Sequence, residues 1–247
     1  MGERRGGNAV SRSRRDLPVR ALYEAKTIAA RYPAVALPLA HVLGRNHPIG
    51  PDTEIVIEGF PRSATSFAVA AFELAQGRKP VTAHHVHAPA QVIEAVRRRI
   101  PVLLLIREPE EAVLSYVVRR PELTVGQALR GYVRFYAPLV AYRKDVVIGA
   151  YPRVVTRFGD VINEVNQRFG TSFVPFEHTA ANVRTCLDTI EAYVRRNHPP
   201  ERFERVVPRP SAERSALKEG IRPRYHAESL ARWRNRAEAL YRDLAND

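Results

Sequence analysis

Short apolar runs that alternate with helical patterns fill the first two thirds of the chain, and this alternation constrains the fold more than any other feature. The apolar runs have the length of buried strands and cover residues 54–58, 81–86, 102–106 and 146–150. Apolar residues at helical spacing occupy the segments 65–76, 89–99 and 109–119. Such alternation is typical of parallel strands joined by helical crossovers. The sequence therefore predicts an α/β domain with a short central parallel sheet flanked by helices in three layers.

The remaining elements are predicted from caps and periodicity. A helical segment over 19–43 is expected to break or kink near Pro33 and Pro38. Thr124 begins the pattern of a capping box, which opens a helix over 125–142. Further helices are predicted over 157–169, 180–196 and 227–245. The segment 198–224 is rich in proline and arginine and is predicted to be a long loop, of the kind that often closes over a site.

A chain of 247 residues is long enough to bury one sizeable core. Residues 1–17 are rich in glycine, arginine and serine, and they are predicted to form a disordered basic arm. The rest, 18–247, is predicted to be one domain, with its motifs in 54–173 and a helical and loop part in 174–247.

The formal net charge of +13 indicates an anionic partner. The arginines are spread over the whole chain without a recognisable nucleic-acid module, so no specific nucleic-acid partner is expected. Weak contact between the basic arm and an acidic membrane surface is conceivable. The single cysteine, Cys186, fits a reducing compartment and the role of a small core residue. No apolar stretch approaches the roughly 20 residues of a membrane span, and we expect a cytoplasmic protein.

The first candidate site is the strand-to-helix turn "EGFPRSATSF", residues 58–67. Backbone N–H groups at the start of a helix bind anions. Arg62 adds a permanent positive charge, and Ser63, Thr65 and Ser66 add hydroxyl donors. The turn lacks the lysine followed by Ser or Thr with which nucleotide-hydrolysing enzymes hold phosphate and magnesium. It is predicted to hold a phosphate compound, and the alternative is an ordinary helix cap.

The second candidate site is "LLLIREPEEAVLSYVV", residues 103–118. Arg107 stands where a predicted strand ends, and Ser115 lies two turns into the next helix. Ligands of open parallel sheets collect at the carboxyl ends of the strands, so both side chains are expected to face one crevice. They form a candidate site for a second phosphate. The alternative is that Arg107 pairs with a nearby glutamate of the same helix.

The third candidate site is "TAHHVHAPAQV", residues 82–92. His85 and His87 point the same way if the strand continues through them. A metal site would need a third ligand that the neighbourhood does not supply, so no metal is predicted. A histidine just beyond a strand end is better placed to act as a general base.

The three motifs together resemble the sulfotransferases that use 3′-phosphoadenosine 5′-phosphosulfate (PAPS). The family's 5′-phosphosulfate loop, P-K-S-G-T-T-W, matches residues 61–67, and its K-T-H-x-P segment matches 85–89. Its 3′-phosphate motif, R-D-P-R-D-x-x-x-S-Y, matches 107–116. A later segment, Y-E-D-L followed by a helix and F-L-G, falls within 151–170. The resemblance covers about residues 54–173.

The resemblance implies a P-loop type fold, PAPS as the co-substrate, and transfer of a sulfuryl group to a hydroxyl without a metal. It implies that His87 is the general base, with His85 as the next candidate, and that Arg62 stabilises the transition state. The residues implied to bind the nucleotide are Arg62, Ser63, Ala64, Thr65, Ser66, Phe67, Arg107 and Ser115. Weaker candidates for the same role are Tyr151, Lys218 and Arg222.

Three departures from the family pattern bear on these roles. Arg62 replaces a lysine, which keeps the charge but changes its geometry. Ala64 replaces a glycine, and we therefore expect that this position does not need a positive φ. Pro152 and Arg153 stand where the family has an acidic pair.

The acceptor is expected to be a small molecule, a carbohydrate or a lipid-like compound with a hydroxyl group. Two other functions stay open at this point. One is an atypical ATP-dependent kinase with a phosphate loop, and the other is a non-catalytic protein that binds anions or nucleic acids.

Overall fold

The structure of the chain, a computed structural model, describes residues 16–44, 47–207 and 211–245. Four parallel strands form one sheet in the order β2-β1-β3-β4. The strands are β1 (Ile55–Gly59), β2 (Thr82–His84), β3 (Val102–Ile106) and β4 (Val147–Ala150). The predicted basic arm lies, up to residue 15, outside the described residues.

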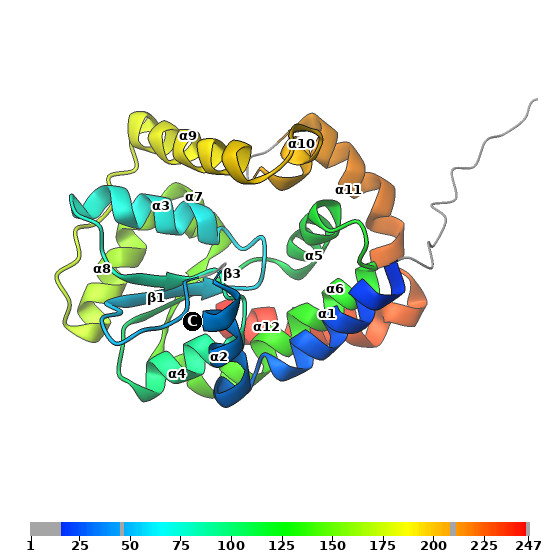
Figure 1. Cartoon of the computed structure of the whole chain (residues 1–247), viewed down its shortest axis with the longest axis horizontal. Coiled ribbons are helices and arrows are strands. Elements are labelled where there is room, and N and C mark those ends of the chain that lie inside the picture. The colour runs from blue at the N-terminus through cyan, green and yellow to red at the C-terminus, as the bar shows by residue number, and fades with distance from the viewer. Residues whose placement is uncertain (1–15, 45–46, 208–210, 246–247) are drawn as a thin grey trace, which may run out of the picture.

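Alternate residues of each strand enter two separate cores, which makes the molecule three layers thick. Ile57 and Leu105 face one core, which is completed by α3 (Thr65–Gln76), α7 (Tyr151–Thr156), α8 (Phe158–Phe169) and α9 (Ala180–Asn197). Val56 and Leu104 face the other core, which is completed by α4 (Pro89–Arg97), α5 (Pro109–Arg119), α6 (Val125–Tyr136) and α12 (Ala231–Ala245). Figure 1 shows α3 and α9 on one side of the sheet and α4 on the other. The predicted α/β class is confirmed.

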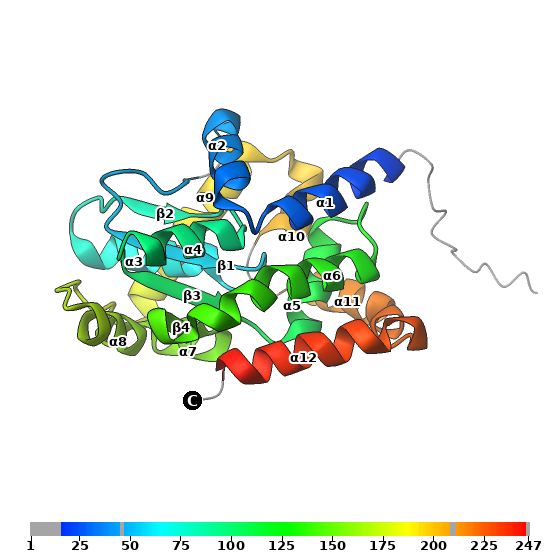
Figure 2. The same ribbon diagram turned by 90° about the horizontal axis from the view of Figure 1, so that it is seen from below.

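Two boundaries predicted from proline and capping residues are confirmed. The N-terminal segment divides at Pro33 into α1 (Leu17–Ala29) and α2 (Pro33–Leu43), and α2 keeps Pro38 inside it. Thr124 and Gln127 form a complete capping box. Figure 2 places α1 and α2 at the β2 side of the molecule and α12 at the β4 side.

The predicted long loop over 198–224 is wrong. This segment contains η3 (Pro200–Arg202), α10 (Phe203–Val206) and the 14-residue helix α11 (Ala212–Tyr225), which Ser211 caps. Its prolines misled the prediction because a proline is tolerated in the first turn of a helix, as in η3, and near a C-terminus, as Pro223 is in α11.

Other predicted boundaries need smaller corrections. The helix predicted over 125–142 ends at Tyr136 and continues as the 3₁₀ segment η2 (Ala137–Asp145), because Pro138 cannot donate a hydrogen bond. The final helix is preceded by η4 (Glu228–Leu230). Tyr151 opens the short helix α7, which the sequence did not predict. The strand predicted over 81–86 stops at His84, where the chain turns.

Cys186 is buried in the α3–α9 core, as predicted. Burial raises the pKa of its thiol to about 11, as expected for a small core residue. Among the described residues, no helix has both the length and the hydropathy that a membrane span requires.

Candidate functional site

The three motifs meet at one edge of the sheet because the strands are parallel. β1 leads into the turn at residues 60–64, β2 into the histidine segment 84–88, and β3 into Arg107. The β1–β3 contact is close at this edge, since a Cβ on Gly59 would lie 2.6 Å from the Leu105 carbonyl oxygen. The carboxyl edge of the sheet is where ligands of such folds collect.

The turn after β1 holds two residues in the left-handed region. Arg62 has φ 77° and Ala64 has φ 72°. The expectation that Ala64 needs no positive φ is therefore wrong: the backbone of a glycine turn is kept although a Cβ is present. Non-glycine residues in this region cost free energy and persist where the surroundings enforce them.

The turn also contains a buried hydroxyl group that lacks a bonding partner. Thr65 is the first residue of α3 and is 4% exposed. Its Oγ1 has no hydrogen-bond partner among the described residues. A buried polar atom of this kind indicates a missing partner. Together with the first N–H groups of a 12-residue helix, it forms a site suited to an anion.

Two tyrosines of α6, one helical turn apart, hold the strand ends in place. The Tyr136 hydroxyl donates to the Leu105 carbonyl at 2.7 Å and accepts from the Phe60 N–H at 3.2 Å. The Tyr132 hydroxyl donates to the Arg107 carbonyl at 2.8 Å. Both side chains are fully buried, and burial raises the pKa of each phenol above its ordinary value. Their hydrogen bonds fix the backbone of the turn and of the β3 end, from which the side chains of Arg62 and Arg107 extend.

A buried glutamate shapes the histidine segment. Glu58 of β1 is fully buried, and its carboxylate accepts hydrogen bonds from the backbone N–H groups of Val86 and His87 at 3.0 and 3.1 Å. The side chain of Gln91 donates to the same oxygen at 3.1 Å. His85 and His87 have φ values of 60° and 53°. The carboxylate thus stabilises the strained turn that follows β2 and carries both histidine rings.

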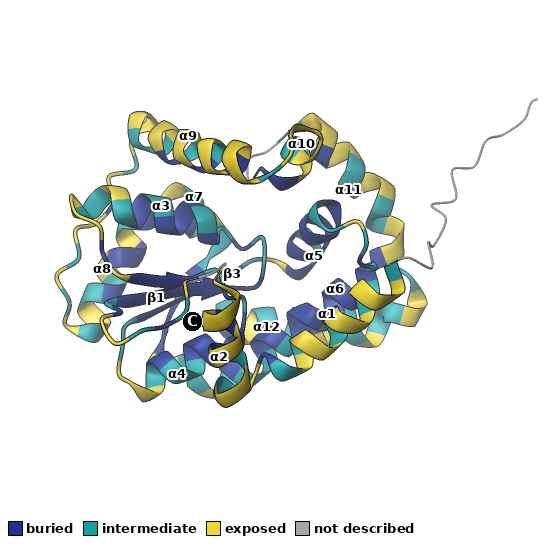
Figure 3. Ribbon diagram, viewed as in Figure 1, coloured by how far each residue is buried: buried dark blue, intermediate teal, exposed yellow. Residues whose placement is uncertain are grey.

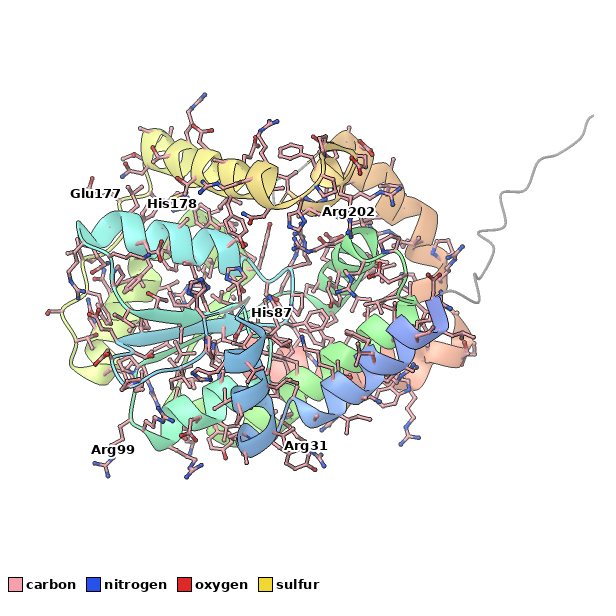
Figure 4. The ribbon with its side chains drawn as sticks, in the orientation of Figure 1. Arg31, His87, Arg99, Glu177, His178 and Arg202 are labelled. Atoms are coloured by element: carbon pink, nitrogen blue, oxygen red, sulfur yellow. The ribbon has the colours of Figure 1, made fainter. Side chains whose placement is uncertain are left out.

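The ring of His87 is oriented by its Nδ1 atom. Nδ1 lies 2.8 Å from the Gly59 carbonyl oxygen and 3.4 Å from a Glu58 carboxylate oxygen. A carbonyl only accepts, so Nδ1 carries the hydrogen and a neutral ring keeps Nε2 as an acceptor. The side chain is 26% exposed. Figure 4 shows His87 near the centre of the molecule, beside the strand ends.

His85 is engaged at both ring nitrogens. Its Nε2 lies 3.1 Å from Ser66 Oγ, and its Nδ1 lies 2.6 Å from Nδ1 of His84. Burial holds the pKa of His85 well below its usual range, and the nearby histidines lower it further. Burial likewise lowers the pKa of His84 to about 3. Both rings are therefore neutral near pH 7. Within the described ranges, no set of three His, Cys, Asp or Glu side chains is arranged to hold a metal ion.

Arginines converge on Ser115, which is 2% exposed. Arg62 Nε and Arg214 Nη2 each donate to Ser115 Oγ at 3.0 Å. Arg62 and Arg119 both donate to the Val206 carbonyl, at 3.1 and 3.2 Å. Burial lowers the pKa of all three guanidinium groups, and neighbouring arginines lower it further. Crowded, desolvated cations of this kind form a site that an anion would stabilise.

Arg107 completes this group. Its Nη1 donates to the Arg62 carbonyl at 3.2 Å, and its Nη2 donates to Glu111 at 3.0 Å. The guanidinium lies 4.1 Å from the centre of the Tyr151 ring. The glutamate pairing considered for Arg107 thus exists alongside its contact with the turn. Arg62, Arg107, Ser115 and Tyr151, which come from four separate elements, are brought together.

Lys218 and Arg222 are placed differently. Lys218 pairs with Glu111 at 2.7 Å, and Arg222 pairs with Glu110 and Glu219. Both lie on α11 beside the start of α5, whereas Arg214 is the α11 residue that reaches Ser115. Figure 1 shows α10 and α11 passing outside α5.

Sequence reasoning missed five residues of the site: Glu58, Arg119, Tyr132, Tyr136 and Arg214. Glu58 carried a signal, since an acid inside a buried apolar strand requires a partner. Arg119 and Arg214 carried none among so many arginines. Their role depends on α10 and α11 packing along α5, which no local pattern reveals.

Comparison with known proteins finds a likeness among solved structures alone, and that likeness is weak. No model of a protein family matches the sequence, and no curated protein does so either. A search of solved structures found the mouse sulfotransferase SULT7A1 complexed with PAP. The likeness covers 81% of this chain and 87% of the mouse chain, with a TM-score of 0.43 and 12% sequence identity. At that TM-score and identity, nothing about activity is transferred from the mouse protein.

Proposed function

We propose that this protein is a sulfotransferase that moves a sulfuryl group from PAPS to the hydroxyl group of an acceptor. The observation that carries the proposal is one juxtaposition at the sheet edge. The turn after β1, with its unpartnered Thr65 hydroxyl, lies next to the arginines that contact Ser115. The His87 ring, with Nε2 as an acceptor, lies at the same edge of the sheet, where its Nδ1 contacts Gly59. The motif resemblance supports the same reading.

The two ends of PAPS call for two anion sites close together. The N–H groups at the start of α3, with the hydroxyls of Thr65 and Ser66, suit the 5′-phosphosulfate. Arg107, Ser115 and Arg214 suit the 3′-phosphate, which distinguishes this donor from ATP. The Arg62 side chain extends from the turn to Ser115 Oγ, 3.0 Å from its Nε, and this contact supports the proposal that one nucleotide binds at both sites. Tyr151 would help to hold the nucleotide beside Arg107.

The chain's own groups supply the steps of the reaction. PAPS, when bound, supplies an activated sulfuryl group with a phosphate leaving group. His87 Nε2 takes the proton of the acceptor hydroxyl, whose oxygen forms the new S–O bond as the bond to the leaving phosphate breaks. Gly59 and Glu58 hold the ring and stabilise the imidazolium. The N–H groups of the turn and Arg62 stabilise the charge that develops on the leaving phosphate, at a few kcal/mol per donor.

Calorimetry with 3′,5′-bisphosphoadenosine tests nucleotide binding directly. We expect it to bind at least about tenfold more tightly than adenosine 5′-phosphate, because charge-assisted hydrogen bonds to a phosphate contribute about 1.5 to 3 kcal/mol each. Equal affinity for the two ligands would remove the 3′-phosphate assignment. A preference for ATP that requires magnesium would favour the kinase alternative, and salt-sensitive nucleic-acid binding without nucleotide affinity would favour the non-catalytic one.

The role of His87 is tested by transfer of labelled sulfate to cell extracts. We expect His87→Asn to lower turnover about 100-fold or more, as for loss of a general base, with bisphosphoadenosine affinity unchanged. His226→Asn, which alters an exposed histidine on α11's C-terminal side, is the matched control. Full turnover in the His87 variant would show that His87 is not the general base, and His85 would be the next candidate.

A further inference from the structure

Helices α1 and α2 carry most of the exposed apolar surface of the protein. Nine of the thirteen exposed large hydrophobic side chains in the described residues lie between residues 17 and 43. Figure 3 shows exposed residues along both helices on the side facing the viewer. Scattered exposed apolar residues are normal on a protein surface, but a concentration on one helical pair indicates an interaction site.

The polarity of α1 is inverted relative to an ordinary surface helix. Its exposed positions include Leu17, Leu22 and Ile28, with Ala21 and Ala25 between them. Its charged Arg20 and Glu24 instead face the protein: Arg20 donates to the Glu122 carbonyl, and Glu24 pairs with Arg130 and Arg134 of α6. α1 thus buries Tyr23 and pairs Arg20 and Glu24 with the protein, while its large aliphatic side chains face solvent, which is unusual for a surface helix.

α2 continues this surface. The helix contains no Asp, Glu, Lys or Arg, and its exposed residues include Val35, Leu39, Val42 and Leu43. Val42 is 83% exposed, the highest fraction among the large hydrophobics of the described chain. We call Leu22, Ile28, Val35, Leu39 and Val42 the apolar surface of α1–α2.

Positive charge lies next to this apolar surface. Arg31 is exposed between the two helices and projects at the outer edge of the molecule (Figure 4). The fifteen residues before the described chain contain five arginines and one acidic residue, Glu3. Apolar residues beside basic ones match the interface of a membrane with anionic headgroups.

We propose that the apolar surface of α1–α2 docks on an anionic lipid bilayer. Charge complementarity favours this partner over a second copy of the chain. Two copies that met at this surface would bring together two arginine-rich N-termini on proteins of net charge +13. In a bilayer, by contrast, the valines and leucines would insert among the acyl chains and the arginines would contact anionic headgroups.

The docking surface adjoins the candidate active site. Ala30 and Ala40 pack against Val86 and Ala88, which flank His87, and the Ala90 N–H donates to the Ala30 carbonyl at 3.0 Å. The buried face of the helix pair thus packs on the histidine segment, and these two helices would lie between that segment and a docked bilayer. Resting on the proposed function, this proximity makes a hydroxyl on a membrane lipid the acceptor that we infer, of the lipid-like class expected from the sequence.

Vesicle sedimentation of the full chain tests the docking. We expect binding to vesicles that contain phosphatidylglycerol, weaker binding to pure phosphatidylcholine, and weakening by salt. The double variant Leu39→Ser/Val42→Ser should lose at least about tenfold in partitioning, because each buried methylene contributes to insertion. Val174→Ser/Tyr193→Ser removes two exposed apolar side chains elsewhere and should bind like the parent protein. Circular dichroism confirms that both variants fold.

Three outcomes would overturn the docking proposal. They are no binding to anionic vesicles, equal binding by the Leu39/Val42 variant and the parent, and a dimer in analytical ultracentrifugation that this variant abolishes. The last would assign the surface to a second copy. Affinity for bisphosphoadenosine, measured on the same variants, reports the proposed function separately and should not change.

Discussion

At the scale of single residues, backbone strain marks the candidate site. The described chain has five non-glycine residues with positive φ, and four of them, Arg62, Ala64, His85 and His87, follow the ends of β1 and β2. Each such residue costs about 1 to 3 kcal/mol, and strain of this kind clusters at functional sites. The surroundings enforce it here, through Glu58 at the histidine segment and through Tyr136 at the turn.

Replacing Ala64 by glycine tests this strain. We expect Ala64→Gly to raise the free energy of unfolding by about 1 kcal/mol, because glycine adopts a positive φ without the steric cost of a Cβ. Urea denaturation measures the change. Ala192→Gly, at an exposed position inside α9, is the control and should lower stability by about 1 kcal/mol. Destabilisation by both substitutions would contradict the positive φ at residue 64.

At the scale of elements, α11 is the one whose position matters most for the site. It packs along α5, so that Arg214 reaches Ser115 while Lys218, one turn further on, meets Glu111. The two side chains have the same charge and sit on the same helix. Only the first of them lies among the arginines of the candidate phosphate site.

The two cations of α11 are therefore expected to behave differently. Arg214→Ala should weaken binding of bisphosphoadenosine at least about tenfold, since a charge-assisted hydrogen bond to a phosphate is lost. Lys218→Ala should change it less than about threefold, because Lys218 is occupied by a partly exposed ion pair. Calorimetry on both variants measures this difference. A larger loss in the Lys218 variant would mean that the nucleotide binds one turn further along the same face of α11.

At the scale of the whole molecule, the histidines at the sheet edge link stability to pH. His84 has a pKa of about 3 in the folded protein because it is buried, against about 6.5 for an ordinary histidine. Below pH 6.5 the unfolded chain therefore binds a proton that the folded chain does not. Stability is fully present above that pH and declines as the pH falls towards 3.

Denaturation at two pH values checks this linkage. Between pH 7.5 and pH 5, His84 alone should lower the free energy of unfolding by about 2 kcal/mol. His84→Gln should show a smaller pH dependence than the parent protein over the same interval. His226→Gln, which replaces a histidine with a half-exposed side chain, should keep the parent's dependence. Identical pH profiles for all three proteins would mean that folding does not lower the pKa of His84.

The sequence determined the fold class, because alternating periodicities of strand and helix are local properties of the chain. The same is true of the strand-to-helix turn after β1 and of caps such as Thr124. The sequence did not reveal the φ of Ala64, the helix α11 or the convergence of Arg119 and Arg214. These depend on contacts between residues 28 to 99 positions apart, where Glu58 and Tyr136 supply the hydrogen bonds that offset local strain. Tertiary packing determines such features, and its free energy contributes only after segments distant in the sequence have come into contact.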